Sequence, residues 1–451
     1  MELMRYKRVV LLFLFILQFT NAKGAVLVAA GNLGHGYRTP ILAVSNDPNA
    51  GKWALKSGTD FPDHGYFNTA SCMGRGTTAV CTAVGQDDIA SLPLLTVSTD
   101  GGSNWMRKSV NGLPYKQGIF HATSCTNTGA TAICTAAGSN ISVDDPTRSS
   151  PLIAVSNDGG NSWAVKSPPV FLYGSLQGIS CTGSGANAVC VAVGTNDVGG
   201  PLLVLSQDGG QTWTMKSIST NLSFNSVSCT GSGSNAICAA VGTGDTEGSS
   251  DNGLFLLTVS TDGGNTWSIK SIPNLPNKGF FNSVSCTGSG PTAICAAAAW
   301  ADGPPLLVVS TDGGNTWMVK QVKDFPSSAY GRFYSVSCSG SAPTAICVAA
   351  GTAKWGPAGP PLLAVSLDGG NNWLLKQVPG LPSNCIFQTT SCTGSGPTAI
   401  CTAGGSIMDV HNNDGPPMLA MSTNGGNNWK LESIPNITSF GFFNGAAATD
   451  G

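Results

Sequence analysis

The sequence predicts an all-β fold, an eight-bladed β-propeller of four-stranded antiparallel blades, and three observations support this prediction. A pattern of an apolar run, a Ser-x-Asp-Gly-Gly turn and a tryptophan occurs eight times, with the first and last copies degenerate. Its period of about 50 to 58 residues is typical of propellers and solenoids. Seven cysteine pairs share one spacing, and the two chain ends carry complementary parts of the repeat.

One complete repeat shows how four strands arise from the pattern. Phe280–Cys286 and Ala293–Ala298 are expected as the first two strands, joined by a glycine-rich hairpin. A variable loop leads to the third strand, Leu306–Ser310, which is apolar on both faces, as a strand between packed layers is. The fourth strand is expected over Trp317–Val322. Four consecutive antiparallel strands make one propeller blade.

The turn between the third and fourth strands has its own chemistry. Asp312 can accept hydrogen bonds from backbone N–H groups, and Gly313 and Gly314 can adopt the positive φ of a tight turn. Trp317 can then lie against the turn. The eight turns contain Asp47 with Trp53, Asp100 with Trp105, Asp158 with Trp163, Asp208 with Trp213, Asp262 with Trp267, Asp312 with Trp317, Asp368 with Trp373 and Asn424 with Trp429.

The chain ends predict how the ring closes. Ala25–Gly31 matches a second strand, with Leu27 where the second cysteine stands in other repeats. Phe442–Gly451 matches a first strand, with Ala448 at the first cysteine position. One C-terminal and three N-terminal strands would therefore form the final blade, with Leu27 and Ala448 as neighbours. The alternative, an open solenoid, would need capping repeats.

Fourteen cysteines predict seven local disulfides. The expected pairs are Cys72 with Cys81, Cys125 with Cys134, Cys181 with Cys190, Cys229 with Cys238, Cys286 with Cys295, Cys338 with Cys347 and Cys392 with Cys401. Two cysteines facing each other across a hairpin are close enough for a disulfide. The spacing matches no familiar zinc site, so no metal is expected. Cys385 is left over, either as a buried thiol, which we favour, or as an intermolecular bridge.

Composition indicates an exported protein that binds no nucleic acid. Residues 1–22 resemble a secretory signal peptide, with a basic start and an apolar core too short to span a bilayer, and 23–451 is expected as a single domain. Charged residues are 10% of the chain, against about 25% in ordinary soluble proteins, and no basic stripe is present. We therefore expect a secreted or periplasmic protein, without a membrane span and monomeric.

The repeated turn resembles the Asp-box, or BNR repeat, and the resemblance covers nearly all of 23–451. It implies a propeller scaffold like that of sialidases and sortilin-type receptors, with the working face opposite the boxes. Tyr37-Arg38-Thr39-Pro40 is similar to the Arg-Ile-Pro motif of sialidases. Only five arginines follow residue 22, too few for a convincing sialidase triad, and sialidases resemble six blades rather than eight.

Candidate ligand-binding residues lie in the loops that vary between second and third strands, because function concentrates on loops of a rigid scaffold. They are Arg38, Trp300, Asp302, Lys354, Trp355, Asp409, His411 and Asp414. Trp300 and Trp355, the two tryptophans outside the boxes, could stack on sugar rings. The alternative is that each folds over its own loop as a hydrophobic plug.

The leading functional hypothesis is binding of a glycan or an extracellular surface protein through the variable loop face, with no cofactor. A glycoside hydrolase is the first alternative. It needs two carboxylates roughly 5 to 10 Å apart, such as Asp302 with Asp409 or Asp414. A structural or adhesive surface protein is the second alternative.

Overall fold

The structure is a computed structural model of the 451-residue chain. It describes residues 24–34, 38–56, 61–114, 117–141, 148–166, 173–244, 253–325, 330–353, 359–408, 414–437 and 439–449. The predicted signal peptide, 1–22, lies outside the described residues, as do Lys354, Trp355, Asp409 and His411. Asp414 is described only as the first residue of a strand.

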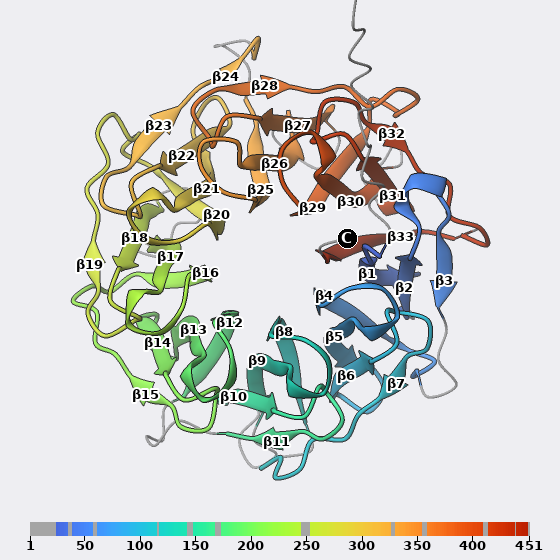
Figure 1. Ribbon diagram of the computed structural model, residues 1–451, viewed down its shortest axis with the longest axis vertical. Helices are drawn as coiled ribbons and strands as arrows, with labels where there is room; N and C mark the ends of the chain where they lie inside the picture. Colours follow the sequence, from blue (N-terminus) through green and yellow to red (C-terminus); the bar gives the residue numbers. More distant parts are fainter. Residues whose placement is uncertain are drawn as a thin grey trace, which may run out of the picture.

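The described residues form strands and short 3-10 turns, without an α-helix. The strands are arranged radially around a central opening (Figure 1). The first three sheets, each written in spatial order, are β3 Ala54–Lys56, β2 Thr39–Ser45, β1 Leu27–Leu33 and β33 Gly441–Ala448; β4 Gly65–Met73, β5 Val80–Asp87, β6 Leu92–Ser98 and β7 Met106–Arg107; and β8 Gln117–Thr126, β9 Ile133–Ile141, β10 Ser149–Ser156 and β11 Ala164–Val165.

The remaining strands continue the pattern around the ring. They are β12 Gly174–Thr182, β13 Val189–Asn196, β14 Pro201–Ser206 and β15 Thr214–Met215; β16 Ser223–Thr230, β17 Ile237–Gly244, β18 Leu254–Ser260 and β19 Ser268–Ile269; β20 Gly279–Thr287, β21 Ile294–Ala301, β22 Leu306–Ser310, β23 Met318–Lys320 and β24 Val322–Lys323; β25 Arg332–Ser339, β26 Ile346–Thr352, β27 Pro361–Ser366 and β28 Trp373–Leu375; and β29 Cys385–Thr393, β30 Ile400–Met408, β31 Asp414–Ser422 and β32 Lys430–Leu431. The 3-10 turns are η1 Pro48–Ala50, η2 Gly76–Thr78, η3 Gly129–Thr131, η4 Gly185–Asn187, η5 Gly233–Asn235, η6 Gly290–Thr292 and η7 Gly396–Thr398.

The hydrogen-bonded sheets number seven among the described residues, rather than the predicted eight. Six have four strands, and one has nine. The nine-stranded sheet contains two successive four-strand runs, β20–β23 and β25–β28, because Trp300 pairs with Arg332 and β24 pairs with β28 in parallel. Strands at the boundary between two runs have thus joined sheets that the repeat alone would leave separate.

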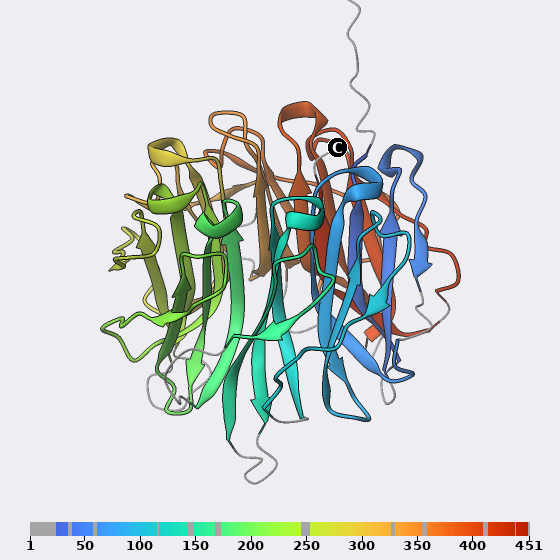
Figure 2. The same cartoon turned by 60° about the horizontal axis from the view of Figure 1, so that its bottom comes forward.

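The two ends of the ring differ in what they carry. The hairpins between first and second strands lie at one end, which we call the hairpin end, together with the Ser-x-Asp-Gly-Gly turns, which we call Asp-box turns after the motif that they resemble. Figure 2 shows 3-10 turns gathered at this end. The connections between second and third strands and the links between four-strand runs lie at the other, which we call the loop end. This follows from the antiparallel pairing of each run, since successive turns alternate between the two ends.

The chain ends meet as the sequence predicts. β1 pairs antiparallel with β33, and Leu27 stands opposite Ala448 in the register. β1 also pairs with β2, and β2 with β3, so three N-terminal strands and one C-terminal strand share a sheet. The prediction that Leu27 and Ala448 are neighbours is confirmed.

All seven predicted disulfides are present, so the cysteine pairing read from the sequence is confirmed at every pair. Each joins a first strand to the second strand of the same run, with a Cα–Cα distance of 4.1 Å. The bonds join Cys72 to Cys81, Cys125 to Cys134, Cys181 to Cys190, Cys229 to Cys238, Cys286 to Cys295, Cys338 to Cys347 and Cys392 to Cys401. The second cysteine of every pair is fully buried, at 0% exposure, namely Cys81, Cys134, Cys190, Cys238, Cys295, Cys347 and Cys401.

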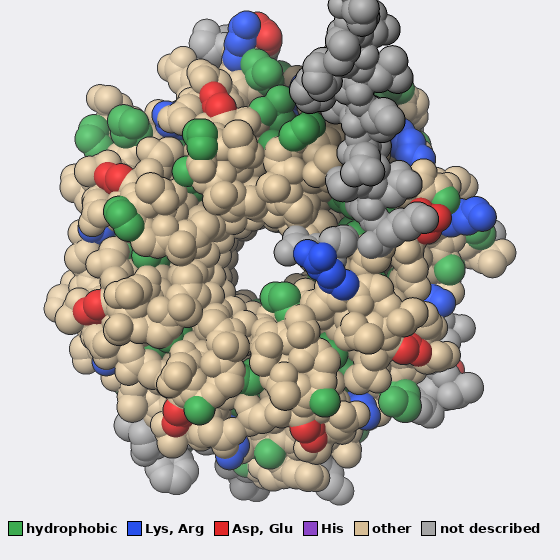
Figure 3. Space-filling model, in the orientation of Figure 1, with side chains coloured by type: hydrophobic (Ala, Val, Ile, Leu, Met, Phe, Trp, Pro, Cys, Tyr) green, Lys and Arg blue, Asp and Glu red, His purple; other side chains and the backbone are tan. Residues whose placement is uncertain are grey.

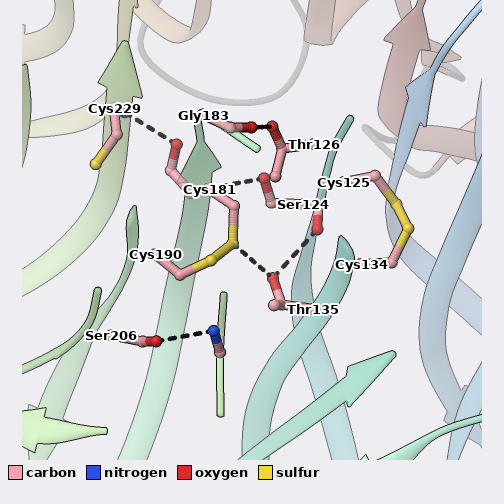
Figure 4. Close-up of a disulfide and its surroundings, with 12 residues drawn as sticks. Ser124, Cys125, Thr126, Cys134, Thr135, Cys181, Gly183, Cys190, Ser206 and Cys229 are labelled. Atoms are coloured by element: carbon pink, nitrogen blue, oxygen red, sulfur yellow. Dashed lines mark hydrogen bonds between the residues drawn. A yellow bond between two sulfur atoms is a disulfide. The ribbon is translucent and has the colours of Figure 1, made fainter. Parts of the chain in front are cut away.

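Hydrogen bonds next to the disulfides join successive units (Figure 4). The backbone N–H of Cys181 donates to Ser124 Oγ of the preceding unit at 3.0 Å, and Thr126 Oγ1 donates to the Gly183 carbonyl. The same serine bond occurs at Cys125, Cys229, Cys286, Cys338 and Cys392. The disulfide hairpins therefore also carry the contacts that hold one unit to the next.

The Asp-box turn is held by its own side chains. Asp312 accepts hydrogen bonds from Ser310 Oγ at 2.8 Å and from Thr316 N at 2.9 Å, and Trp317 Nε1 donates to the Gly314 carbonyl at 3.2 Å. Burial disfavours the charged carboxylate, but the bonds from Thr316 and Ser310 outweigh it and hold the pKa of Asp312 below its usual value. In the degenerate first turn, the buried Trp53 Nε1 has no partner.

The turns also pack against the neighbouring unit. Gly314 has φ +84°, and a Cβ there would lie 2.8 Å from Val259 Cγ1 of the preceding unit. The apolar clusters likewise cross the boundaries between units. One of them combines Val241 and Leu257 with Phe281 and Trp317 of the next unit. Each unit therefore completes its core only with its neighbours.

Substituting both Leu27→Cys and Ala448→Cys is predicted to form an eighth disulfide, because these residues occupy the register of the seven natural pairs. Closing a loop of this length would stabilise the fold by up to about 6 kcal/mol in the chain-entropy model. Thiol titration and chemical denaturation check this, with Leu27→Cys alone as the control. Three titratable thiols in the unfolded, unreduced double variant, instead of Cys385 alone, would contradict the assigned closure.

The Asp-box bonds predict acid sensitivity. Because the pKa of Asp312 is lower in the folded than in the unfolded chain, its bonds add stability above the unfolded pKa of about 3.9 and lose it as the pH falls through the folded value. Asp312→Asn is expected to lower the melting temperature at neutral pH and to approach the wild type as the pH falls through the lowered folded pKa of Asp312. Thermal denaturation across this range tests it, and a pH-independent difference would refute the linkage.

Candidate functional site

Among the described residues, the exposed large hydrophobic side chains lie either at the loop end or on the outermost strands. The exposed large hydrophobic residues at the loop end are Ile89, Tyr173, Val198, Leu254, Tyr330 and Phe440. Ile89 and Val198 are 72% and 84% exposed. The other five described, Met106, Met215, Ile269, Met318 and Leu431, lie on the outermost strands. Single exposed apolar side chains are common on soluble proteins, whereas a contiguous apolar patch marks an interaction surface.

The hairpin end is different in character. Figure 3 views this end, and its visible surface is mostly uncharged polar side chains and backbone, with acidic side chains at separate positions around the ring. The Asp-box carboxylates are occupied by hydrogen bonds within their own turns, as at Asp208, where Ser206 and Thr212 donate to it. These carboxylates are structural, so the loop end is the better place to look for a ligand.

A pocket of about 280 Å³ opens at the loop end beside Asp302. Its lining comes from three segments: the connection after β21, the link before β20, and the chain around β24. Asn274, Asp302 and Gln321 supply polar groups, while Pro305 and Phe325 supply apolar surface. Lys320 also reaches the lining. A few polar groups on an apolar wall suit a small polar ligand.

Asp302 is the candidate that the structure brings into this pocket, and its side chain is exposed. Sequence reasoning did not name Asn274, Gln321 and Phe325, which lie in the links between units. Their only sequence signal is position: each flanks the outermost strand of its unit. These residues line the pocket because the link before β20 packs against the chain around β24.

Trp300 does not provide the exposed platform that the sequence suggests. It lies in β21, is 7% exposed, and its ring is 5.3 Å from that of Phe280 on the neighbouring strand. The expectation of an exposed ring is wrong because β21 continues through Ala301, which places Trp300 inside the sheet rather than in a loop. Trp300 is buried, as the plug alternative expects, but it packs against Phe280 of the neighbouring strand rather than over its own loop.

Arg38 is held by protein groups at the junction between two units. Its Nη2 lies 2.7 Å from Asp88 Oδ1 and its Nε 3.0 Å from Asp88 Oδ2, a bidentate ion pair. The guanidinium also lies 3.8 Å from the centre of the Tyr66 ring. Burial raises the pKa of Tyr66, although Arg38 opposes this. Arg38 therefore links the start of β2 to the next unit. Because the Asp88 carboxylate neutralises its charge, Arg38 is not available to bind an anionic ligand.

Two other arginines lie over aromatic rings at the loop end. Arg148 lies over Tyr173, at 4.6 Å, and Arg332 lies over Tyr334, at 4.2 Å. Neither Arg332 nor Tyr334 was a sequence candidate, since an arginine at the start of an inner strand shows no motif. Within the described part of the chain, no three His, Cys, Asp or Glu side chains gather as around a metal ion, and no helix is long and apolar enough to span a membrane.

Comparisons with known proteins find resemblance in structure only. No protein-family model matches the chain, and no characterised protein matches it in sequence. YCF48 from Cyanidioschyzon merolae gives a TM-score of 0.43 at 14% identity, over 76% of this chain and 94% of that one. A fungal lectin described as a six-bladed β-propeller, from Aleuria aurantia, gives 0.37 at 11% identity, over 70% and 96%.

An ulvan lyase of polysaccharide lyase family PL25, bound to a GlcA-Rha3S segment, gives a TM-score of 0.40 at 13% identity, over 77% of this chain and 93% of that chain. These scores are low, so no residue role or activity is transferred from these three structures to this chain. The functional argument rests on the loop end itself.

Cys385 is the unpaired cysteine, and it is buried. Its Sγ donates to the Pro382 carbonyl at 3.0 Å, and burial raises its pKa to about 12. The preference for a buried thiol over an intermolecular bridge agrees with this burial. Such a thiol is nearly all protonated at neutral pH and a poor nucleophile.

Folded protein is therefore predicted to resist iodoacetamide at pH 8, and to gain one adduct, at Cys385, when it is unfolded without reductant. Peptide mass spectrometry of the alkylated chain identifies the site. Rapid labelling of Cys385 in the folded protein would contradict the burial. A disulfide-linked dimer would instead support the intermolecular bridge.

Proposed function

We propose that this protein is an exported, non-enzymatic binding protein that recognises a glycan through its loop end. Residues 1–22 would be the signal peptide and 23–451 a single Asp-box domain. Counting the two four-strand runs of the nine-stranded sheet as two blades makes the domain an eight-bladed propeller closed by β1 and β33. Seven disulfides suit an oxidising environment outside the cytoplasm.

The observation that carries the proposal is the pocket at Asp302. A sugar presents hydroxyls on its edge and C–H groups on its faces. The Asp302 carboxylate and the amides of Asn274 and Gln321 can take hydroxyls, while Phe325 and Pro305 offer apolar surface to a ring face. The pocket is small, so we expect one or two sugar units to enter it.

Binding is favoured over hydrolysis by the make-up of this pocket. Its described lining contains Asp302 as its one carboxylate, whereas glycoside hydrolysis by the common mechanisms uses two. The pairing of Asp302 with Asp409 or Asp414 remains a hypothesis, because those side chains lie outside the described residues. A surface protein is the alternative partner, supported by the exposed Ile89 and Val198 at the same end.

Asp302→Asn is predicted to weaken glycan binding by about tenfold, because it replaces charge-assisted hydrogen bonds with neutral ones. A glycan array with neutral and acidic oligosaccharides finds the ligand, and calorimetry with the best one measures the effect. Asp197→Asn, an exposed aspartate in another loop-end connection, is the matched control and should bind like the wild type.

Unchanged affinity in Asp302→Asn would reject the pocket as the binding site. Failure of the whole array, together with capture of a partner in a pull-down from extracellular extracts, would favour a protein partner instead. Turnover of chromogenic glycosides that is lost in Asp302→Asn would favour the hydrolase.

A further inference from the structure

Arg332 is a partly buried cation that forms no ion pair with the described residues. It begins the inner strand β25 at the loop end and is half-buried. Its guanidinium lies 4.2 Å from the centre of the Tyr334 ring and 5.7 Å from that of Phe280. Its Nε is buried without a hydrogen-bond partner, and no described carboxylate forms an ion pair with it.

Arg38 is an arginine of the same molecule whose charge and N–H groups are paired with a carboxylate, and it serves as a comparison for Arg332. It too lies over a tyrosine, but Asp88 supplies two hydrogen bonds to its guanidinium. Aromatic faces attract a cation, yet they accept no strong hydrogen bonds from its N–H groups. Partial burial of a charge is costly unless an anion and hydrogen bonds replace water. Arg332 has the aromatic part of this environment and lacks the anionic part.

The repeat shows that the fold does not need a cation at this position. Arg332 directly precedes the fully buried Phe333 of its inner strand. The residues at the equivalent place in the other inner strands are Tyr66, Ile119, Ser175, Ser223, Phe280, Ile386 and Phe442. All seven are uncharged, so the arginine serves something other than the packing of an inner strand.

The position of Arg332 connects it to the proposed ligand pocket. Gly331 N donates to the Gly303 carbonyl at 3.2 Å, so the residues before Arg332 and after Asp302 are hydrogen-bonded to each other. β25 is an inner strand that packs next to β20 and faces the central opening (Figure 1). A ligand held at Asp302 could therefore extend inward toward Arg332.

We propose that Arg332 binds the carboxylate of an acidic sugar, which makes the ligand of the loop end a uronate-containing glycan. This rests on the proposed glycan-binding function and specifies its substrate class. A planar carboxylate matches the two parallel N–H groups of a guanidinium, as Asp88 matches Arg38. Tyr334 and Phe280 lie beside the guanidinium but accept no strong hydrogen bonds from it, so its N–H groups remain available to a carboxylate.

The test compares tri-galacturonate with its fully methyl-esterified form, which keeps the shape of the trimer and removes its charges. Wild-type protein is expected to bind the charged trimer at least about tenfold more tightly. Arg332→Gln should abolish this preference, and Arg332→Lys should restore only part of it, because an ammonium is not a planar fork. Arg75→Gln removes an exposed arginine at the hairpin end and should leave the preference unchanged.

The outcomes separate this inference from the proposed function. Equal binding of both trimers by the wild type, or an unchanged preference in Arg332→Gln, overturns the role of Arg332 while glycan binding at Asp302 stands. If Asp302→Asn binds like the wild type but Arg332→Gln loses the preference, the pocket assignment fails and the acidic-sugar site stands.

Thermal stability without ligand provides a second test that needs no glycan. Arg38→Met should lower the melting temperature, because it leaves Asp88 without its partner. Arg332→Met should leave the melting temperature unchanged or raise it, because it removes a cation that has no counterion among the described residues of the free protein. A drop at Arg332→Met as large as that at Arg38→Met would show that the guanidinium is already satisfied, and would overturn the proposal.

Discussion

The pairing of β1 with β33 is the constraint on which the rest of the structure depends. Every apolar cluster draws residues from two successive units, so an unclosed array would leave one unit with an uncovered face. Strand pairing between the two chain ends closes the ring with backbone hydrogen bonds and no disulfide. The first and last parts of the chain are therefore needed together before any unit has both of its neighbours.

The junction after the closing sheet lacks one of the repeated inter-unit bonds. At six junctions a serine hydroxyl of one inner strand accepts a bond from a cysteine N–H of the next, but Ala447 stands at the equivalent serine position. Thr449 compensates at the hairpin end by exchanging hydrogen bonds with Val26 inside the closing sheet. At the loop end, the Arg38–Asp88 ion pair spans the junction. A residue that the sequence suggested as a ligand contact thus belongs to ring closure.

The sequence predicts the repeated features well because each follows from the repeat pattern, either within one repeat or from the complementary parts of a repeat at the two chain ends. The disulfide hairpins, the Asp-box turns and the register of Leu27 with Ala448 all follow from spacing. It predicts poorly what depends on contacts between units. Trp300 is buried because β21 runs longer than expected, and Phe325 reaches the Asp302 pocket only because two links pack together. No local pattern encodes either result. The joining of two runs into one nine-stranded sheet has the same origin.

An internal repeat supplies comparisons that a single sequence otherwise lacks. Equivalent positions share one backbone environment, so a side chain that the fold requires should recur, as the box tryptophans do. A charged side chain found once, partly buried and without an ion pair among the described residues, costs stability that the seven other positions avoid. The disulfides and serine hydrogen bonds of the hairpin end hold the units together independently of the loop end. They can therefore offset the stability lost through an unpaired charge at the loop end. The division of the ring into a stabilising end and a variable end is thus what permits a cation such as Arg332 to remain unpaired until a ligand supplies the anion.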